Sequence, residues 1–554
     1  MFGARFDDAE AGRSFALTDP LEEIASTEFS GVRGALERAS AASTSGMWVA
    51  GYVTYEAAPA FDDALTVNAP TGGPLVWFGV FGDRVDVEPP TINPSAARGY
   101  SVSRWIPAWD AGRYATAFGE IQQHIAQGDT YQVNLTFPMN AAFSGPAEQM
   151  YSDLLAAQLP RYAAHVWHGN THILSVSPER FFAVANGRIT TRPMKGTAPR
   201  GRWIEEDELQ RRSLLESEKD RAENLMIVDL LRNDLGRIAE FGSVCVDELF
   251  TIEKYQTVWQ MTSEISATLQ DSVDLRDVFS ALFPCGSVTG APKARSMNII
   301  ADLEEEARGP YCGAVGFIPP GNGLDGASFN VAIRTAVLDE SEGVARYGVG
   351  GAVTWDSDVD AEYEEALTKA RVLAGRPADV QLIETIRWDD GYFMLDEHLA
   401  RLSGSAKYWA MPCDIDSLCS MLSDLEEDMN GATKVRLLAS GNGTVAFSLS
   451  AAPERFPLGP GPADQRIRVS IDRIPLDTSD PRRFHKVADR KPFDERLKRN
   501  PGVDDVLCVN EQGNITESTI ANAVFLIDGV WRTPPITDGL LGGILRERLI
   551  FEGT

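Results

Sequence analysis

A break at residues 375–378 limits the fold of this chain more than any other feature, because a helical pattern ends there. The break reads Gly375-Arg376-Pro377-Ala378, and glycine and proline both interrupt regular structure. The chain has 554 residues, more than a single hydrophobic core usually accommodates. The sequence therefore predicts two domains, at residues 1–375 and 376–554, with the informative motifs of the first between residues 100 and 375.

The charge of the chain limits the partners that it can have. Its formal net charge is −29, which argues against binding to nucleic acid or to an anionic membrane. An anionic substrate would therefore need cations placed in a site. The sequence shows no apolar run typical of a membrane span or a signal peptide, and its six cysteines lack metal-binding spacing. These features predict a cytoplasmic protein with reduced cysteines.

Lys195 lies in the stretch Thr190–Gly201, which reads Thr-Thr-Arg-Pro-Met-Lys-Gly-Thr-Ala-Pro-Arg-Gly. The two threonines are typical of a strand, and the prolines and glycines after them interrupt it. We therefore expect Lys195 where a strand gives way to a loop. A lysine partly removed from water has a lowered pKa, and its neutral amine is a nucleophile. A solvated surface lysine is the alternative.

Three charged residues stand in apolar surroundings. Glu179 interrupts the apolar segment 173–185, where a carboxyl group can act as a proton donor; a surface turn is the alternative. Glu223 has no local partner in a helix predicted over residues 219–239, which is apolar nearly all round and therefore expected to be buried. Arg334 is embedded in Val-Ala-Ile-Arg-Thr-Ala-Val, where a guanidinium needs a counter-ion or an anionic ligand.

Two further stretches could bind ions. A glycine-rich turn within residues 281–300 leads into a helix and offers backbone N–H groups to an anion, with Lys293 and Arg295 adding positive charge. A helix predicted over residues 358–374 places Glu362, Glu365 and Lys369 on one face. That face is either a solvated ion pair or part of a site in which a carboxylate meets Glu223 to hold a hard cation, for which Mg²⁺ is suited.

Together these motifs resemble the chorismate-utilising enzymes, and among them the aminodeoxychorismate synthase type. That type carries lysine in a Pro-x-Lys-Gly-Thr context, as at Lys195, whereas anthranilate, isochorismate and salicylate synthases usually carry alanine. Anthranilate synthase component I is therefore the less favoured alternative. The resemblance implies an α+β fold, a two-part antiparallel β-sandwich with outer helices and the site between its halves. It covers Gly128–Thr136, Ser177–Phe182, Thr191–Gly201, Lys219–Ile238, Phe283–Met297, Tyr311–Phe317, Arg334 and Gly350–Leu373.

The resemblance implies a reaction at Lys195. Its amine would attack C2 of chorismate while the C4 hydroxyl leaves, and Glu179 would protonate that hydroxyl. Ammonia would then add at C4 and release the lysine, which gives 4-amino-4-deoxychorismate. The sequence contains no Gly-x-Cys-x-Gly elbow of a glutamine-hydrolysing domain. The ammonia is therefore expected from a separate glutamine amidotransferase subunit or from solution.

The same resemblance implies the groups that bind chorismate and its metal ion. Mg²⁺ would hold one substrate carboxylate, and an arginine with glycine N–H groups would hold the other. Gln260 stands where relatives often have a histidine, so that the histidine's role is absent or taken over by an amide. The implied residues are Glu223 and Glu365 for Mg²⁺, Arg334, Gly350 and Gly351 for a carboxylate, and Thr197, Glu362 and Lys369 for the remaining substrate site.

Motifs in the second half, weak one by one, resemble in order and spacing the fold-type IV pyridoxal-phosphate enzymes. These include branched-chain aminotransferases and aminodeoxychorismate lyase. The resemblance implies a smaller α/β domain that binds pyridoxal phosphate; a solvated basic face around Lys486 is the alternative. Lys486 would hold the cofactor covalently, Glu517 would pair with its pyridine nitrogen, and Arg401 with the backbone of Gly543 and Ile544 would hold its phosphate. The motifs are at residues 382–387, 397–402, 484–490, 515–525, 533–535 and 541–546.

The pairing of the two halves predicts a bifunctional enzyme of folate biosynthesis. A lyase would remove pyruvate from the product of the first half and yield 4-aminobenzoate. Lyase relatives usually continue beyond the last motif, whereas this sequence ends at Thr554. We therefore expect a second half that is short at its C-terminus, either as a shortened enzyme or as a non-catalytic docking domain.

Overall fold

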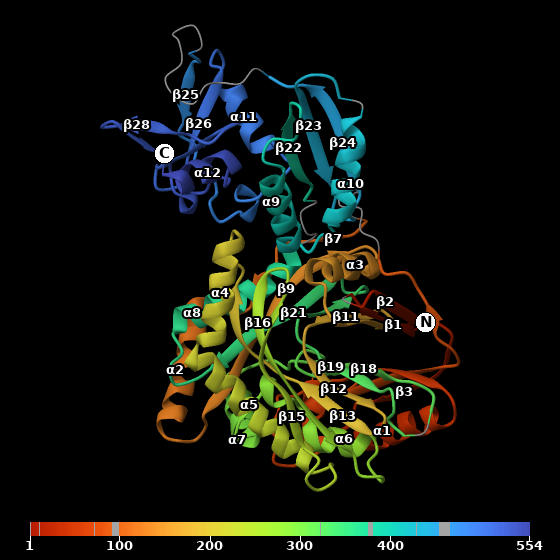
Figure 1. Ribbon diagram of the computed structural model, residues 1–554. Coiled ribbons are helices and arrows are strands. Elements are labelled where there is room, and N and C mark those ends of the chain that lie inside the picture. The colour runs from red at the N-terminus through yellow and green to blue at the C-terminus, as the bar shows by residue number, and fades with distance from the viewer. Residues whose placement is uncertain are drawn as a thin grey trace. The chain divides into compact units, whose positions relative to one another are not determined.

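A computed structural model describes the chain (Figure 1) apart from residues 1, 10, 71, 91–98, 322, 375–379, 428, 454–465 and 554. The described residues form two compact units. The first unit contains Met1–Pro199 and Arg212–Pro377, and the second contains Arg200–Arg211 and Ala378–Thr554. The predicted break at Gly375–Ala378 lies outside the described residues.

Two large antiparallel sheets form the first unit. The first sheet has the order β17 (Gly290–Ala291), β9 (Gln132–Ser144), β21 (Val344–Val353), β20 (Thr335–Asp339), β11 (Thr171–Ser177), β10 (Tyr162–His168), β1 (Phe2–Asp8), β2 (Arg13–Leu17) and β6 (Val85–Asp86), with β7 (Ser101–Val102) and β8 (Ile106–Pro107) on β9. The second has the order β14 (Met194–Pro199), β16 (Val258–Thr268), β13 (Arg188–Arg192), β12 (Arg180–Ala185), β19 (Ser328–Val331), β18 (Ala314–Ile318), β4 (Trp48–Val53), β5 (Val76–Phe81) and β3 (Pro20–Ser26), with β15 (Cys245–Lys254) on β16.

The two sheets pack face to face, and helices cover their outer faces. Phe6 from the first sheet and Trp77 and Val315 from the second belong to one buried cluster between them. A second cluster joins the second sheet to α1 (Phe29–Thr44), α5 (Glu218–Gly236) and α6 (Leu275–Leu282). A third joins the first sheet to α2 (Ala111–Ala126), α3 (Ala147–Gln158), α7 (Lys293–Leu303) and α8 (Val359–Lys369). The predicted two-part antiparallel sandwich with outer helices is therefore confirmed.

Short 3₁₀ turns connect several of these elements, at η1 (Tyr55–Ala60), η2 (Gly286–Val288) and η3 (Ala370–Ala374).

The prediction that residues 219–239 form a fully buried helix is wrong in part. Helix α5 ends at Gly236, and Asp229 and Arg232 form an exposed pair 2.8 Å apart on its outer side. Only the opposite side is buried, because charged side chains remain hydrated where the helix faces water.

The second unit contains smaller sheets with helices around them. An antiparallel sheet joins β22 (Leu382–Trp388), β23 (Thr433–Ala439) and β24 (Val445–Ala451). In a second sheet β25 (Val469–Asp472) runs parallel to β26 (Asp505–Val509), which pairs with β27 (Ile515–Ser518). A hairpin joins β28 (Phe525–Ile527) to β29 (Val530–Arg532). The helices are α9 (Leu395–Tyr408), α10 (Ile415–Glu426), α11 (Lys491–Arg499) and α12 (Ile544–Glu552), with η5 (Pro481–Arg483) and η6 (Ile536–Asp538).

The second unit also includes residues 200–211, which contain the first turns of α4 (Ile204–Glu216). The Tyr408 hydroxyl donates to the Gly201 carbonyl over 2.7 Å, and Trp203 stacks on Phe484 with ring centres 5.0 Å apart. These contacts explain why the segment groups with residues that follow it by more than two hundred positions.

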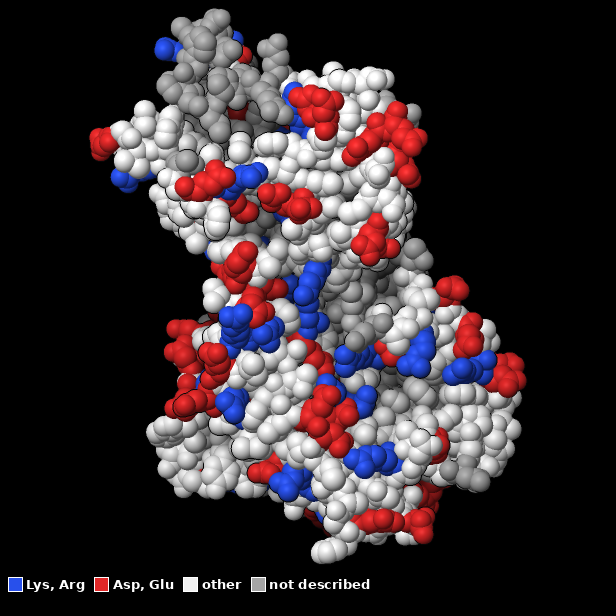
Figure 2. Space-filling model, in the orientation of Figure 1, with Lys and Arg blue, Asp and Glu red and all other residues white. Residues whose placement is uncertain are grey.

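The surface carries both signs of charge, despite the large negative total. On the face shown in Figure 2, lysine and arginine side chains are interspersed with aspartate and glutamate. Among the described helices, none combines the length and the apolar sequence that crossing a membrane requires.

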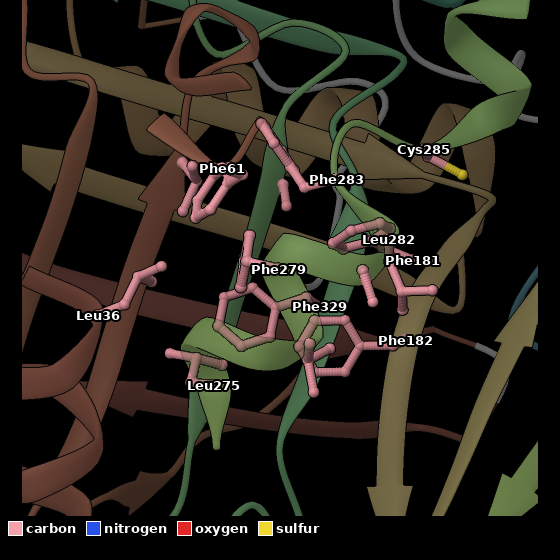
Figure 3. Close-up of a cluster of buried hydrophobic side chains, with 14 of the residues drawn as sticks. Leu36, Phe61, Phe181, Phe182, Leu275, Phe279, Leu282, Phe283, Cys285 and Phe329 are labelled. Carbon is pink, nitrogen blue, oxygen red and sulfur yellow. The ribbon is translucent and has the colours of Figure 1, made fainter. Parts of the chain in front are cut away.

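Phe279 lies at the centre of an aromatic cluster between α6 and the second sheet (Figure 3). Its ring centre lies 5.6 Å from that of Phe329 and 5.7 Å from that of Phe181. The side chain is fully buried. Replacing it with alanine would leave a large apolar cavity that its neighbours fill only in part.

We expect Phe279→Ala to lower the free energy of unfolding of the first unit by about 3–5 kcal/mol, the range for a buried phenylalanine. Calorimetry of the full chain measures the change, with the transition of the second unit as internal reference. Phe241→Ala is the matched control, because Phe241 is fully exposed. Equal transitions for the two variants would contradict the importance of the cluster.

Candidate active sites

A cavity of about 150 Å³ lies in the first unit where edges of the two sheets meet. Strands β9 and β21 of the first sheet and β14 and β16 of the second contribute to its wall, with α5 and α8. The structure brings together here the residues to which the resemblance assigns roles in the first half: Glu179, Lys195, Thr197, Glu223, Arg334, Gly350, Gly351, Glu362, Glu365 and Lys369.

Lys195 lies within strand β14, so the expectation of a loop at this position is wrong. The strand pairs with β16 in shifted register between Met194 and Thr197, and Gly196 has a φ of +93°. Such a bulge re-aims the side chains of the strand. Burial lowers the pKa of Lys195 because desolvation disfavours the ammonium, although the charge of Glu223 opposes this shift. Part of the population is therefore neutral at lower pH than for a solvated lysine.

Glu179 lies in the break between β11 and β12 and is only 2% exposed, so it is not part of a surface turn. Burial raises its pKa to about 7, against the effect of Ser287, whose hydroxyl donates to Oε1 over 2.6 Å. The Cys285 thiol lies 3.9 Å from the same oxygen. A carboxyl group with this pKa can carry a proton near neutral pH. Ser287 was not foreseen as a site residue, although it lies in the glycine-rich turn that the sequence shows.

Four carboxylates border the cavity from two helices, and Asp220 of α5 is one of them. Glu223 projects from α5, and Glu362 and Glu365 project from α8. The Lys219 Nζ lies 4.0 Å from Glu223 and 3.8 Å from Glu362. The Lys369 Nζ lies 3.1 Å from Glu365 and donates to the Gly350 carbonyl over 2.9 Å.

This donor set fits Mg²⁺. Among the described residues no group of three or more histidine, cysteine, aspartate or glutamate side chains forms a ready cage for a metal. Magnesium is bound in proteins by one or two carboxylates and completes its shell with water and substrate oxygens. Glu223 and Glu365 meet that requirement because both face the cavity.

Arg334 occupies the link between β19 and β20 rather than a strand, with a φ of +50°. Its guanidinium lies 5.8 Å from the centre of the Tyr255 ring. No carboxylate of the described part of the chain pairs with it, so its N–H groups can bind an anionic ligand. Gly350 and Gly351, at the neighbouring part of β21, present backbone to the same cavity.

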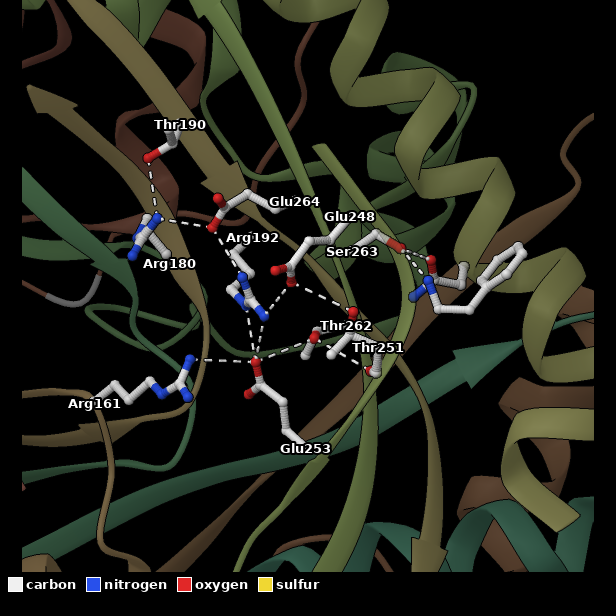
Figure 4. A network of polar contacts seen from close by, with 12 residues as sticks. Arg161, Arg180, Thr190, Arg192, Glu248, Thr251, Glu253, Thr262, Ser263 and Glu264 are labelled. Atoms are coloured by element: carbon white, nitrogen blue, oxygen red, sulfur yellow. Dashed lines mark hydrogen bonds and ion pairs between the residues drawn. The ribbon is translucent and has the colours of Figure 1, made fainter. Parts of the chain in front are cut away.

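A network of ion pairs lies on the second sheet (Figure 4). Arg192 pairs with Glu248, Glu253 and Glu264 at 2.8–2.9 Å. Glu253 in turn accepts a hydrogen bond of 3.0 Å from the Tyr255 hydroxyl. The network thereby fixes the ring against which Arg334 rests.

The expectation that Lys293 and Arg295 add charge to an anion site is wrong. Lys293 pairs with the buried Asp234 at 3.0 Å, and Arg295 pairs with Asp129 at 2.6 Å. Their positive charges therefore stabilise the packing of α7 instead of facing the cavity.

A second cavity, of about 480 Å³, lies in the second unit and is lined by Arg401, Lys486, Glu517, Gly543 and Ile544. Burial lowers the pKa of Lys486 to about 8 and raises the pKa of Glu517 to about 8. The Leu541 amide donates to Glu517 over 3.3 Å. The expected residues of the second half are therefore gathered at one place.

Glu384 does not line this cavity, but it contacts two residues that do, His398 and Arg401, and the sequence reasoning missed it. It lies in β22, and Arg401 pairs with both its oxygens at 2.8 and 2.7 Å. Burial alone would raise its pKa, but hydrogen bonds from His398 and Arg401 lower it to about 2. Its oxygen lies 3.9 Å from the Lys486 Nζ. The quoted motifs at residues 382–387 and 397–402 contain both halves of this contact.

The second cavity fits an anionic cofactor such as pyridoxal phosphate. Arg401, Lys486 and Arg546 face it, and Arg401 uses one further N–H group on the Gly542 carbonyl. A side chain at position 543 would meet Asn522 Oδ1 at 1.8 Å. Glycine is therefore required at position 543 by its close packing against Asn522, and it lines the cavity.

Comparisons with known proteins agree with the division of the chain into two units. Residues 8–375 match the family described as chorismate binding enzyme, and residues 381–552 match amino-transferase class IV. Aminodeoxychorismate synthase component 1 of Klebsiella aerogenes is 41% identical over 276 residues, 50% of this chain and 60% of that protein. Anthranilate synthase component 1 of Aquifex aeolicus is 40% identical over 252 residues, 46% of this chain and 50% of that protein.

A solved structure gives the same fold. Anthranilate synthase component I from Streptococcus pneumoniae aligns with a TM-score of 0.57 and 25% identity over 67% of this chain and 92% of its own. The chain spans about 60% of the length of the Klebsiella relative. The resemblance read from the sequence is confirmed. Because the first match covers well over half of the residues, the chain belongs to the family of chorismate-binding enzymes.

Proposed function

We propose that the first unit is an aminodeoxychorismate synthase, which converts chorismate and ammonia to 4-amino-4-deoxychorismate. The observation that carries this proposal is a lysine of lowered pKa in one cavity with a buried acid, a free arginine and two helix carboxylates. The 41% identity to proteins named aminodeoxychorismate synthase component 1 supports it. The second unit would then act on the product as a lyase that releases pyruvate and 4-aminobenzoate.

The reaction proceeds in two displacements at Lys195. The neutral amine bonds to C2 of chorismate, the ring double bonds shift, and the C4 hydroxyl leaves as water with the proton of Glu179. Ammonia then bonds to C4, the double bonds shift back, the lysine leaves C2 as a neutral amine, and the new ammonium group at C4 returns a proton to Glu179. The sum is chorismate plus ammonia to 4-amino-4-deoxychorismate plus water. Covalent capture divides one difficult displacement into two easier ones.

The remaining groups hold the substrate. Arg334 binds one carboxylate together with the N–H groups of Gly350 and Gly351. Glu223 and Glu365 hold Mg²⁺, which when bound supplies positive charge to the other carboxylate. Thr197, Glu362 and Lys369 line the same wall. The ammonia comes from a glutamine amidotransferase partner or from solution, and the protein works in the cytoplasm.

In the second unit the side chains provide the groups that a lyase needs. Pyridoxal phosphate, when bound, supplies an electron sink for the carbon that loses a proton. Lys486 holds the cofactor and moves that proton, Glu517 holds a proton at the pyridine nitrogen, and Arg401 with Gly543 and Ile544 binds phosphate. Three features support this assignment: the pKa of Lys486 is lowered, the pKa of Glu517 is raised, and the backbone at Gly543 carries no side chain.

Lys195→Ala is expected to lower formation of aminodeoxychorismate by at least three orders of magnitude, because no other amine replaces the nucleophile. The assay contains chorismate, ammonia and Mg²⁺, and mass spectrometry separates aminodeoxychorismate, anthranilate and 4-aminobenzoate. Lys407→Ala, at the end of α9, is the control lysine. Unchanged product formation by Lys195→Ala would rule out the covalent route, and anthranilate as the product would exclude the proposed type.

Synthase turnover is expected to fall above about pH 7, because Glu179 must be protonated to release the C4 hydroxyl and its pKa is about 7. Ser287 donates to the ionised carboxylate and lowers that pKa. Ser287→Ala therefore raises it and moves the alkaline limb of the turnover profile to higher pH. Comparison with the parent chain at each pH cancels the titration of ammonia. Ser243→Ala, whose hydroxyl bonds to backbone carbonyls, should leave the limb in place; an unmoved limb in Ser287→Ala would refute the role of Glu179.

Pyridoxal phosphate added to the full chain is expected to give an absorbance band above about 330 nm, where the bound cofactor absorbs. Lys486→Ala should abolish or shift the band, because the buried amine is the group that holds the cofactor. Lys491→Ala removes an exposed lysine of the same basic stretch and should leave the band unchanged. Identical spectra for both variants would favour a non-catalytic second unit.

A further inference from the structure

The pairing of β14 with β16 contains one extra residue at the position of Lys195. Met194 lies opposite Thr262, and Thr197 lies opposite Gln260, so three steps on β14 match two on β16. Gly196 takes its left-handed conformation inside this bulge. A side chain at Gly196 would also come within 2.9 Å of Asp220 Cβ. The bulge therefore has a defined shape, and its peptide groups leave the regular ladder of hydrogen bonds.

Two side-chain amides donate hydrogen bonds to the two backbone carbonyl groups that the bulge removes from the strand ladder. Gln260 Nε2 donates to the Gly196 carbonyl over 2.8 Å, and Asn224 Nδ2 lies 3.4 Å from the Lys195 carbonyl. At the other end of the same amide, Thr197 Oγ1 donates to Gln260 Oε1 over 3.1 Å. An unpaired buried carbonyl group is unfavourable, so these amides stabilise this backbone path against alternatives.

Both amides are themselves held in place. Gln260 is 4% exposed and Asn224 is 1% exposed. Ser263, on β16 in Figure 4, donates to Asn224 Oδ1 over 2.6 Å and accepts from the Phe250 amide over 3.2 Å. The orientation of each amide is therefore fixed by an acceptor or donor at its far end. A side chain locked in this way can position a neighbour within the narrow tolerance that catalysis requires.

We infer that Gln260 is a positioning residue, which holds the β14 bulge so that the amine of Lys195 enters the cavity. This rests on the proposed function of Lys195 as the nucleophile. Gln260 acts through the backbone of Gly196 and the hydroxyl of Thr197, and its amide takes no proton from the substrate. Asn224 supports the preceding peptide in the same manner from α5.

The inference predicts a change in turnover without a change in substrate binding. Arg334, Gly350 and Gly351 are separate from the bulge, so the binding of chorismate survives when the bulge relaxes. Loss of a near-attack position lowers kcat steeply even for displacements of about 1 Å. A residue that only touched chorismate would instead raise KM.

The test compares Gln260→Met with Gln270→Met in the full chain. Gln270 also donates to a backbone carbonyl, that of Ala239 over 2.9 Å, but away from the cavity. We expect Gln260→Met to lower kcat at least tenfold with KM for chorismate within about twofold of the parent. Gln270→Met should change neither constant.

Hydrogen exchange measured by mass spectrometry tests the geometry independently of activity. The amides of residues 194–199 should exchange faster in Gln260→Met and at the parent rate in Gln270→Met. A parent-like kcat and parent-like exchange in Gln260→Met would overturn the inference, as would a raised KM with kcat unchanged. If Lys195→Ala retained activity, the proposed function would fail, and the exchange result alone would then decide whether Gln260 holds the bulge.

Discussion

Desolvation of charged groups in the first cavity is the constraint on which its chemistry depends. Burial disfavours charge on both groups: it lowers the pKa of Lys195 and raises the pKa of Glu179 to about 7. In water the lysine is charged and the carboxyl group is ionised at pH 7. Burial in the sandwich therefore shifts both groups toward their neutral forms, as the proposed function requires of a nucleophile and an acid.

Charge balance in the same cavity explains why a divalent cation suits it. Besides Lys195 and Glu179, the acidic and basic lining residues among those described are four carboxyl groups and three cationic groups: Asp220, Glu223, Glu362, Glu365, Lys219, Arg334 and Lys369. A substrate dianion adds two negative charges, and these need a counter-charge because a dry site stabilises opposite charges strongly. Under the proposed function, Mg²⁺ held by Glu223 and Glu365 would provide it.

Much of this architecture could be predicted from periodicity, and the exceptions have one cause. Helix α2 and strand β9 follow from spacing of apolar residues within their own segments. The bulge at Lys195 does not, because it depends on a partner strand more than sixty residues away. Likewise the partner of Lys293 is Asp234 on another helix, so local sequence indicated a free cation where the fold provides a pair. The resemblance of motifs was enough to name the site residues. The roles of Gln260 and Ser287 could be inferred only from their contacts in the folded structure.

The two cavities use burial in different ways to adjust a lysine. Burial lowers the pKa of Lys195 in the presence of several carboxylates that oppose the shift. At Lys486 a single buried carboxylate, Glu384, opposes it, and that carboxylate is already engaged by Arg401 and His398. Because Glu384 is held by these partners, it in turn fixes the position of Arg401, which brings positive charge to the second cavity.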